Sequence, residues 1–232
     1  MKKRFYDTAA CAKVDGGYAV QLDGRGIKTP QGTPLLMPTQ ALAEAIADEW
    51  NAQGEEIDPK TMEMMPMAGT AIDRVPEVRD GLIEGLLKYA ETDLLCYRAE
   101  RPKDLIQRQK EAWDPVLDWA AKDLGARLKP THGIVAIDQD PEALSALKKV
   151  LEGFDNWTLT AMGELVGISG SLVVGLALIK GHLTVEQALH ICEIDEAHQN
   201  EQWGEDFEAI ERRKNIAKDV TSAHRFFKLA SV

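Results

Sequence analysis

The sequence predicts an α+β fold, with a small N-terminal domain that contains β-hairpins followed by a larger, all-α helical domain. Apolar and polar residues alternate within the first forty residues, as they do in half-buried strands, and turn signals separate these segments. From Thr39 onward, apolar residues recur every three or four positions, which is the period of an amphipathic helix. We place the boundary so that the domains are residues 1–76 and 77–232.

Two hairpins are predicted in the N-terminal domain. The alternating segment 17–22 precedes the turn signal DGRG at 23–26, and residues 27–29 are expected to form the return strand. The stretch PQGTP at 30–34 predicts a second turn. A helix is then expected to begin after Thr39, whose hydroxyl is a suitable N-cap.

The rest of the chain predicts helices with short connectors. A methionine cluster at 62–67 is expected to belong to the core, with an adaptable protein-binding surface as the alternative. Helices are predicted to start near Pro141, Leu159, Ser171 and Thr184, and one short strand is predicted at 134–137. The longest apolar run, 165–179, is too short to span a bilayer and predicts a buried helix.

Charge and composition exclude several classes of protein. The chain has 38 acidic and 27 basic residues, and its net charge of −11 argues against binding nucleic acid or an anionic membrane. No phosphate-binding glycine loop occurs, so we expect no cofactor. Three cysteines without a CxxC motif, and no signal peptide, favour a reducing compartment. We therefore expect no membrane insertion, and a location in a bacterial cytoplasm or, if the chain is a processed form, in the mitochondrial matrix. We expect the free protein to be a monomer, although the sequence does not determine the oligomeric state.

The stretch HICEIDEAHQNEQWGEDFEAIERR, residues 190–213, holds the densest group of chemically active side chains. One interpretation is a metal- or acid/base-dependent hydrolase that uses His190, Glu193, Asp195 and His198. No HExxH motif is present, and each helical pair supplies two metal ligands at most. Exposed helix charge therefore explains these residues better than a metal site does.

Glu196 is the exception within this stretch. On a continuous helix from Val185, an apolar stripe would contain Val185, Leu189, Cys192, Trp203 and Ile210. Two polar residues, Glu196 and Gln199, would fall on the same stripe. Glu196 would lie within about 20° of both Val185 and Trp203, where an unpaired carboxylate is unfavourable. One interpretation is that Glu196 forms a buried ion pair, with Arg98, Arg101 or Arg108 as candidates. The other is that the apolar stripe is partly open and that Glu196 binds an arginine or amide of another protein.

Several segments together resemble one family, the assembly chaperones of the ATP synthase alpha subunit, known as the ATP-twelve family. They cover nearly the whole chain in order: KRFYD (3–7), GYAVQLDGRGIKTP (17–30), ALAEAIADEWNAQ (41–53), IDP (57–59), TAIDRV (70–75), YAETDLLCYRA (89–99), RQKEAWDPVLDWA (108–120) and DEAHQNEQWGED (195–206).

This resemblance implies a non-enzymatic protein with the two-part fold described above. It implies that the chain binds the unassembled alpha subunit transiently and shields its interface until the beta subunit replaces it. It also implies partner-binding residues in the C-terminal signature: Glu196, with Gln199 and Trp203 beside it, and Glu201 as the rival position for the important acid. A stable structural subunit of the synthase is a third class that the sequence leaves open.

Overall fold

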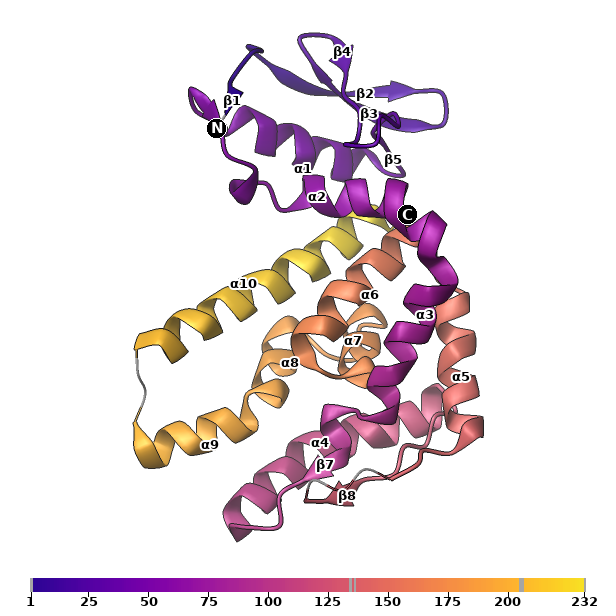
Figure 1. Ribbon diagram of the computed structural model, residues 1–232, viewed down its shortest axis with the longest axis vertical. Coiled ribbons are helices and arrows are strands. Elements are labelled where there is room, and N and C mark those ends of the chain that lie inside the picture. The colour runs from indigo at the N-terminus through magenta and orange to yellow at the C-terminus, as the bar shows by residue number, and fades with distance from the viewer. Residues whose placement is uncertain (1, 134, 136, 205–206, 232) are drawn as a thin grey trace. The chain divides into compact units, whose positions relative to one another are not determined.

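The computed structural model describes residues 2–133, 135, 137–204 and 207–231 (Figure 1). It contains two compact units. The first joins Met1–Arg79 with Asp155–Ala161 and Arg225–Val232, and the second joins Asp80–Phe154 with Met162–His224. Both units therefore combine segments that are distant in sequence. The domain boundary predicted after residue 76 is a statement about which segments fold independently, so it remains a prediction.

A small antiparallel sheet forms one layer of the first unit. Strands β2 (Ala9–Val14) and β3 (Gly17–Leu22) form a hairpin in which Ala9 pairs with Leu22 and Val14 with Gly17. The short strands β4 (Arg25–Gly26) and β5 (Leu36–Met37) both pair with β3. Two further short strands, β1 (Lys2–Lys3) and β6 (Glu56–Ile57), pair with each other.

The predicted turn at 23–26 is confirmed, but the predicted return strand at 27–29 is wrong. Asp23 and Gly24 have φ of 48° and 78°, the left-handed geometry of a tight hairpin turn. The strand after this turn is only Arg25–Gly26, and a single bridge joins Lys28 to Pro34. Beyond Gly26 only single hydrogen bonds continue the pairing, from the N–H of Ile27 to the carbonyl of Val20 and from the N–H of Leu35 to the carbonyl of Ile27 (both 3.1 Å). Prolines at 30 and 34 lack the backbone N–H that a longer ladder needs.

Helix α1 (Gln40–Asn51) packs against β2 and β3 and closes the core of the first unit. Thr39 is its N-cap, as predicted, because the hydroxyl accepts a hydrogen bond from the backbone N–H of Leu42. A 3₁₀ turn (η1, Pro59–Thr61), helix α2 (Met64–Gly69) and a π-helical segment (η2, Thr70–Arg74) follow. Met62 and Met64 are buried, so part of the methionine cluster belongs to the core, as predicted.

Further helices follow along the chain, and three of them, the first, the fourth and the last, have residues in both units. They are α3 (Val75–Glu91), α4 (Lys103–Asp123), α5 (Pro141–Glu152), α6 (Asn156–Ser169), α7 (Leu172–Ile179), α8 (Val185–Cys192), α9 (Ile194–Trp203) and α10 (Phe207–Ala230). A 3₁₀ turn (η3, Leu94–Cys96) leads into β7 (Tyr97–Arg98), which pairs in parallel with β8 (Thr131–His132). The predicted strand at 134–137 includes positions 134 and 136, which lie outside the described residues.

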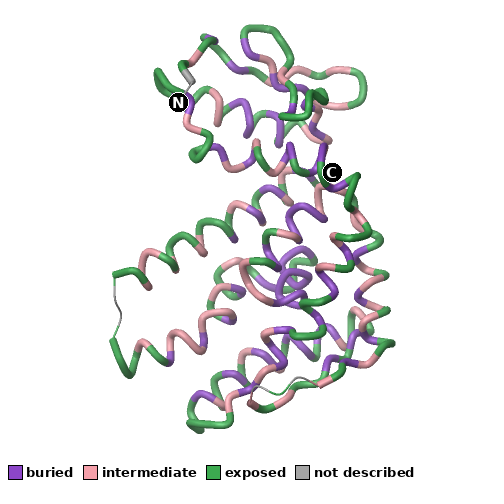
Figure 2. The backbone as a smooth tube through the Cα atoms, viewed as in Figure 1, coloured by how far each residue is buried: buried purple, intermediate pink, exposed green. Residues whose placement is uncertain are grey.

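The apolar run of the sequence forms the centre of the second unit. All eight residues of α7 are buried, which confirms the predicted buried helix (Figure 2). Gly170, with φ of 67°, separates α6 from α7 within this run. Among the described residues, no helix combines the length and apolar character needed to cross a bilayer.

A buried carboxylate ties the start of α7 to η3. Asp93 is fully buried and accepts hydrogen bonds from Ser171 Oγ (2.7 Å) and from the backbone N–H groups of Val173 and Leu95 (both 3.1 Å). Ser171 in turn caps α7 by accepting from the N–H of Val174. Polar groups at a buried helix start are thereby satisfied without water.

Candidate functional site

The predicted continuous helix from Val185 to Trp203 is wrong, because the chain bends at Glu193. Helix α8 ends there and α9 begins, with Glu193 at φ −96° and ψ 0°. The carbonyl oxygen of Ile191 accepts a hydrogen bond of 2.9 Å from the indole Nε1 of Trp113 on α4. This tertiary bond satisfies a carbonyl at the helix end, where intrahelical partners are missing.

The bend changes which residues face the core. The buried positions are Ala188 and Ile191 on α8, and Ile194 and His198 on α9. The predicted apolar stripe is therefore wrong beyond α8: Trp203 is 85% exposed, and Leu189 and Cys192 are only half-buried. Glu196 does not interrupt a buried seam.

Glu196 lies half-buried on α9 and forms an ion pair with α10. Its Oε1 is 2.7 Å from Nη2 of Arg212, and its side chain is 26% exposed. None of the three predicted partners contributes to this pair: Arg98 binds Asp114 and Arg108 binds Glu201. The predicted internal pairing occurs, with an arginine from a helix that sequence spacing did not suggest.

A line of polar contacts joins α4 to the α8–α9 segment. From the start of α4, Asp104 contacts His198 Nε2 at 2.9 Å, and Gln109 donates to Asp195 at 2.6 Å. The Trp113–Ile191 bond continues the line, so α4 runs antiparallel to α8 and α9. Residue numbers rise along α4 while those of their partners fall along α9 and α8. All three contacts are therefore compatible with one alignment of these helices.

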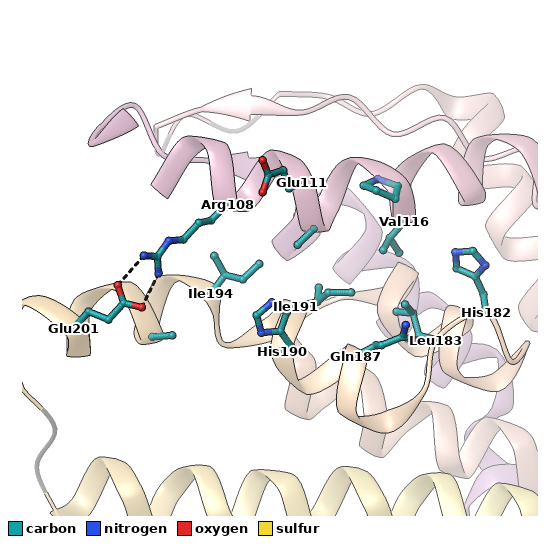
Figure 3. Close-up of a pocket in the computed structure, with 13 residues that line it drawn as sticks. Arg108, Glu111, Val116, His182, Leu183, Gln187, His190, Ile191, Ile194 and Glu201 are labelled. Carbon is teal, nitrogen blue, oxygen red and sulfur yellow. Dashed lines mark hydrogen bonds and ion pairs between the residues drawn. The ribbon is translucent and has the colours of Figure 1, made fainter. Parts of the chain in front are cut away.

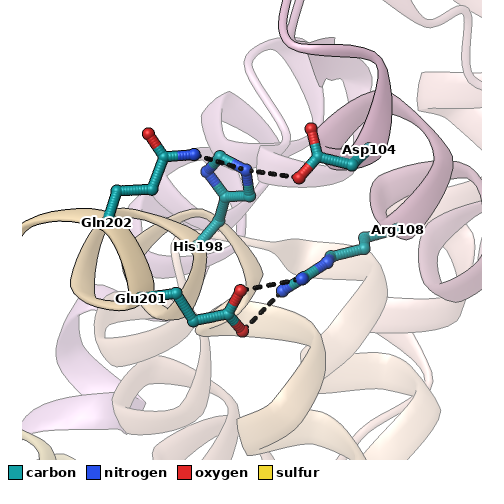
Figure 4. A network of polar contacts seen from close by, with 5 residues as sticks. All are labelled: Asp104, Arg108, His198, Glu201 and Gln202. Carbon is teal, nitrogen blue, oxygen red and sulfur yellow. Dashed lines mark hydrogen bonds and ion pairs between the residues drawn. The ribbon is translucent and has the colours of Figure 1, made fainter.

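Arg108 and Glu201 form a further contact on the exposed side of this line. Two bonds of 2.7 Å join the guanidinium to both carboxylate oxygens, and Figure 4 shows this pair beside Asp104 and His198. The hydrogen bond and charge of Arg108 hold the pKa of Glu201 below its usual range. The hydrogen bond from His198 likewise lowers the pKa of Asp104. Both carboxylates are therefore ionised at neutral pH.

An open groove of about 630 Å³ lies between α4 and the α8–α9 segment. Figure 3 shows Val116 on α4 and Ile191 and Ile194 on the facing segment pointing toward this space. Ala112 and Ala197 also line it, and their short side chains leave room that larger residues would fill. The remaining lining residues are Arg108, Glu111, Pro115, His182, Leu183, Gln187, His190 and Glu201. The floor is thus mainly aliphatic and the edges are polar.

Two exposed aromatic side chains stand at the ends of α9 and α10. Trp203 is 85% exposed at the last residue of α9, and Phe207 is 75% exposed at the first residue of α10. Gly204, with φ of 83°, ends α9. Gln199 is exposed on α9. Sequence analysis selected Gln199 and Trp203 but missed Phe207, whose position directly after an acidic dipeptide gave no signal of exposure.

The four residues of the hydrolase interpretation do not converge. His198 is buried against Asp104, Asp195 binds Gln109, and His190 lies exposed at the groove. Burial is the main cause that raises the pKa of Glu193, which stands at the bend. Within residues 2–133, 135, 137–204 and 207–231, no three or more His, Cys, Asp or Glu side chains are placed to hold a metal ion. The geometry gives this interpretation no support.

Comparison with known proteins places this architecture among chaperones. The crystal structure of Atp12 from Paracoccus denitrificans has a TM-score of 0.95 and 41% identity, and the match covers 99% of each chain. The mitochondrial protein atp12 of Schizosaccharomyces pombe is 28% identical, over 95% of this chain and 81% of its own. Mitochondrial ATP12 of Saccharomyces cerevisiae is 22% identical, over 92% of this chain and 79% of its own.

The family model described as ATP12 chaperone protein matches residues 3–121. The chain belongs to this family, which confirms the resemblance found in the sequence. The α+β fold predicted from the hydrophobic pattern is confirmed as well. The family model ends before α8 and α9, so the groove and its acids are described by the structure rather than by that match.

Proposed function

We propose that this chain is a non-enzymatic molecular chaperone for ATP synthase assembly. In this proposal it binds the unassembled alpha subunit and covers its interface until the beta subunit replaces it. The observation that carries the proposal is the open apolar groove between α4 and the α8–α9 segment, in a protein of the ATP12 chaperone family. A concave, mainly apolar site with a few polar groups at its edges is the usual form of a binding site.

The residues of α9 suit transient binding of a protein. Trp203 and Gln199 are free of the core, and Glu201 and Glu196 are held by arginines that are themselves well exposed. Exposed ion pairs contribute little stability, so a client group can replace either arginine at small expense in free energy. We propose Glu196, Gln199, Glu201 and Trp203 as partner-binding residues on this basis.

The proposed cycle needs no cofactor and no nucleic acid. Release requires moderate affinity, because the beta subunit must compete for the same surface. We propose that the free protein is a monomer that works where the synthase head is assembled, in a bacterial cytoplasm or a mitochondrial matrix. A stable subunit of the synthase would instead be found in the finished enzyme, so its absence there separates the two classes.

Size-exclusion chromatography tests the proposal directly. This protein is mixed with the unassembled alpha subunit of its own organism, and alpha alone serves as the control. We expect a one-to-one complex and less alpha in the void volume, where aggregates elute. Adding the beta subunit is then expected to free the chaperone from the complex. If alpha aggregates equally with and without this protein, the proposed function is wrong.

A further inference from the structure

We infer that the groove between α4 and the α8–α9 segment binds an amphipathic helix of the client, with an aliphatic face and basic residues along its flanks. This inference rests on the proposed function and names the chemistry of the segment that the chaperone receives. It follows from three properties of the groove: its shape, its lining and its charge.

The shape of the groove favours a helix. Its two walls are helical and antiparallel, with the Asp104–His198, Gln109–Asp195 and Trp113–Ile191 contacts holding one side closed. On the open side, Ala112 faces the groove from α4 and Ala197 from α9. A third helix that presents its apolar face into such a groove is a common mode of peptide recognition.

The lining selects aliphatic side chains. Val116, Leu183, Ile191 and Ile194 supply branched aliphatic groups, and among the described residues no Phe, Tyr or Trp lines the groove. Leucine or isoleucine side chains spaced by three and four residues would therefore find matching partners along the floor. Burial of these groups would provide the attraction, since apolar area leaves water.

The charge of the walls selects a basic client segment. Two carboxylates line the groove, Glu111 from α4 and Glu201 from α9, and residues 185–203 contain no lysine or arginine. Arg108 is the one lysine or arginine among the described residues that line the groove, which also include His182 and His190. Arg108 is already bound to Glu201 through an ion pair whose side chains are 43% and 56% exposed. A client lysine or arginine can take its place, because exposed pairs exchange readily with solvent and with other charges.

Two synthetic peptides test the inference without the alpha subunit. Both form amphipathic helices with the same leucine face, and their polar faces carry lysine in one and glutamate in the other. Fluorescence anisotropy measures the binding of each labelled peptide to the full-length protein. We expect the lysine peptide to bind and the glutamate peptide to bind at least about tenfold more weakly. Equal binding of the two peptides, or no binding of either, would overturn the inference.

Filling the groove shows whether the peptide binds there. Ala197→Phe and Ala112→Phe place a ring in the space between the walls, and Ala121→Phe is the matched control on α4, because Ala121 is also half-buried but does not line the groove. We expect both groove variants to bind the lysine peptide about tenfold more weakly, and the control to bind it as the wild type does. Unchanged binding by the two groove variants would overturn the inference.

Charge reversal gives a second test that adds no bulk to the core. Glu111→Lys at the groove edge should weaken binding of the lysine peptide and strengthen binding of the glutamate peptide. Glu142→Lys on α5 should change the binding of neither peptide. Circular dichroism checks that each variant is folded. The alpha subunit is measured in parallel by chromatography. If the wild type binds the lysine peptide but does not bind alpha, the proposed function alone is refuted. If the wild type binds alpha but neither peptide, the groove inference alone is refuted.

Discussion

Glu196 forms its ion pair with Arg212, whose side chain is largely exposed to solvent. Arg212 is 62% exposed while the glutamate is 26% exposed, so the arginine can turn into solvent when a client cation arrives. The pair shows the internal pairing that was one of the two interpretations of Glu196, and binding of a client group by Glu196 remains a proposal. Its contribution to folding is expected to be below about 1 kcal/mol, as for most ion pairs that reach the surface.

We predict that Glu196→Lys abolishes client binding and leaves the fold intact. The new ammonium group repels Arg212, which can move into water, so little stability is lost. Chromatography with the alpha subunit measures binding, and circular dichroism measures folding. The double variant Glu196→Lys with Arg212→Glu restores the internal ion pair in reverse. If the double variant regains client binding, Glu196 acts only by pairing with Arg212.

Asp93 is a residue whose burial dominates its chemistry. Burial raises its pKa to about 6, from an ordinary value of 3.8, although the donors around it favour the ionised form. The folded protein therefore holds this proton more tightly than the unfolded chain does. The contribution of Asp93 to the free energy of unfolding is full below the ordinary pKa and falls as the pH rises through 6.

We predict that Asp93→Ala destabilises the protein by roughly 2–4 kcal/mol near neutral pH, because Ser171 and two backbone N–H groups lose their buried acceptor. The difference in unfolding free energy between wild type and variant should also shrink as the pH rises from about 4 to 6, by up to about 3 kcal/mol. Urea denaturation at several pH values measures both effects. A difference that stays constant with pH would contradict the assigned cause.

At the scale of elements, the crossing of α6 and α7 depends on one glycine. A Cβ atom built at Gly175 would lie 2.8 Å from Cγ2 of Val166 and 3.3 Å from Cε of Met162. The methionine can move, but the branched valine is held within α6 by stiff rotamers. The absence of a side chain at Gly175 thus lets two apolar helices approach closely.

We predict that Gly175→Ala destabilises the protein by about 1–3 kcal/mol, since the added methyl group overpacks the helix crossing. Gly167→Ala is the matched control on α6, because a Cβ at Gly167 meets no atom within 4 Å. Alanine there should stabilise the helix by about 0.5–1 kcal/mol. Thermal unfolding of both variants checks these opposite signs. A neutral or stabilising Gly175→Ala would show that the two helices separate at little expense.

At the scale of the whole molecule, charge and apolar surface have separate roles in binding. The chain carries a net charge of −11, and the carboxylates of Glu111 and Glu201 lie beside the aliphatic floor of the groove. Charge complementarity mainly speeds association and selects the partner, whereas apolar burial provides lasting affinity. The same net charge is expected to oppose self-association, in line with the proposed monomer.

We predict that raising the ionic strength about tenfold slows association with the client and leaves the dissociation rate nearly unchanged, because salt screens charges across the solvent gap but not apolar contact. Surface plasmon resonance with immobilised alpha subunit measures the two rates separately. Glu142→Lys, which lies away from the groove, should show the same salt dependence as the wild type. An association rate independent of salt would exclude electrostatic steering.

The sequence by itself determined the fold class, the cap residues Thr39 and Thr184, the buried apolar run and the family, because these depend on local periodicity, hydrogen bonds within a few residues or ordered motifs. Only the tertiary structure decided the bend at Glu193, where Trp113 of a distant helix binds the carbonyl of Ile191. The pairing of Glu196 with Arg212 and the groove opposite Ala112 also require contacts between separate helices. A helical wheel assumes one straight helix axis. It therefore assigns residues beyond the bend at Glu193 to the wrong face.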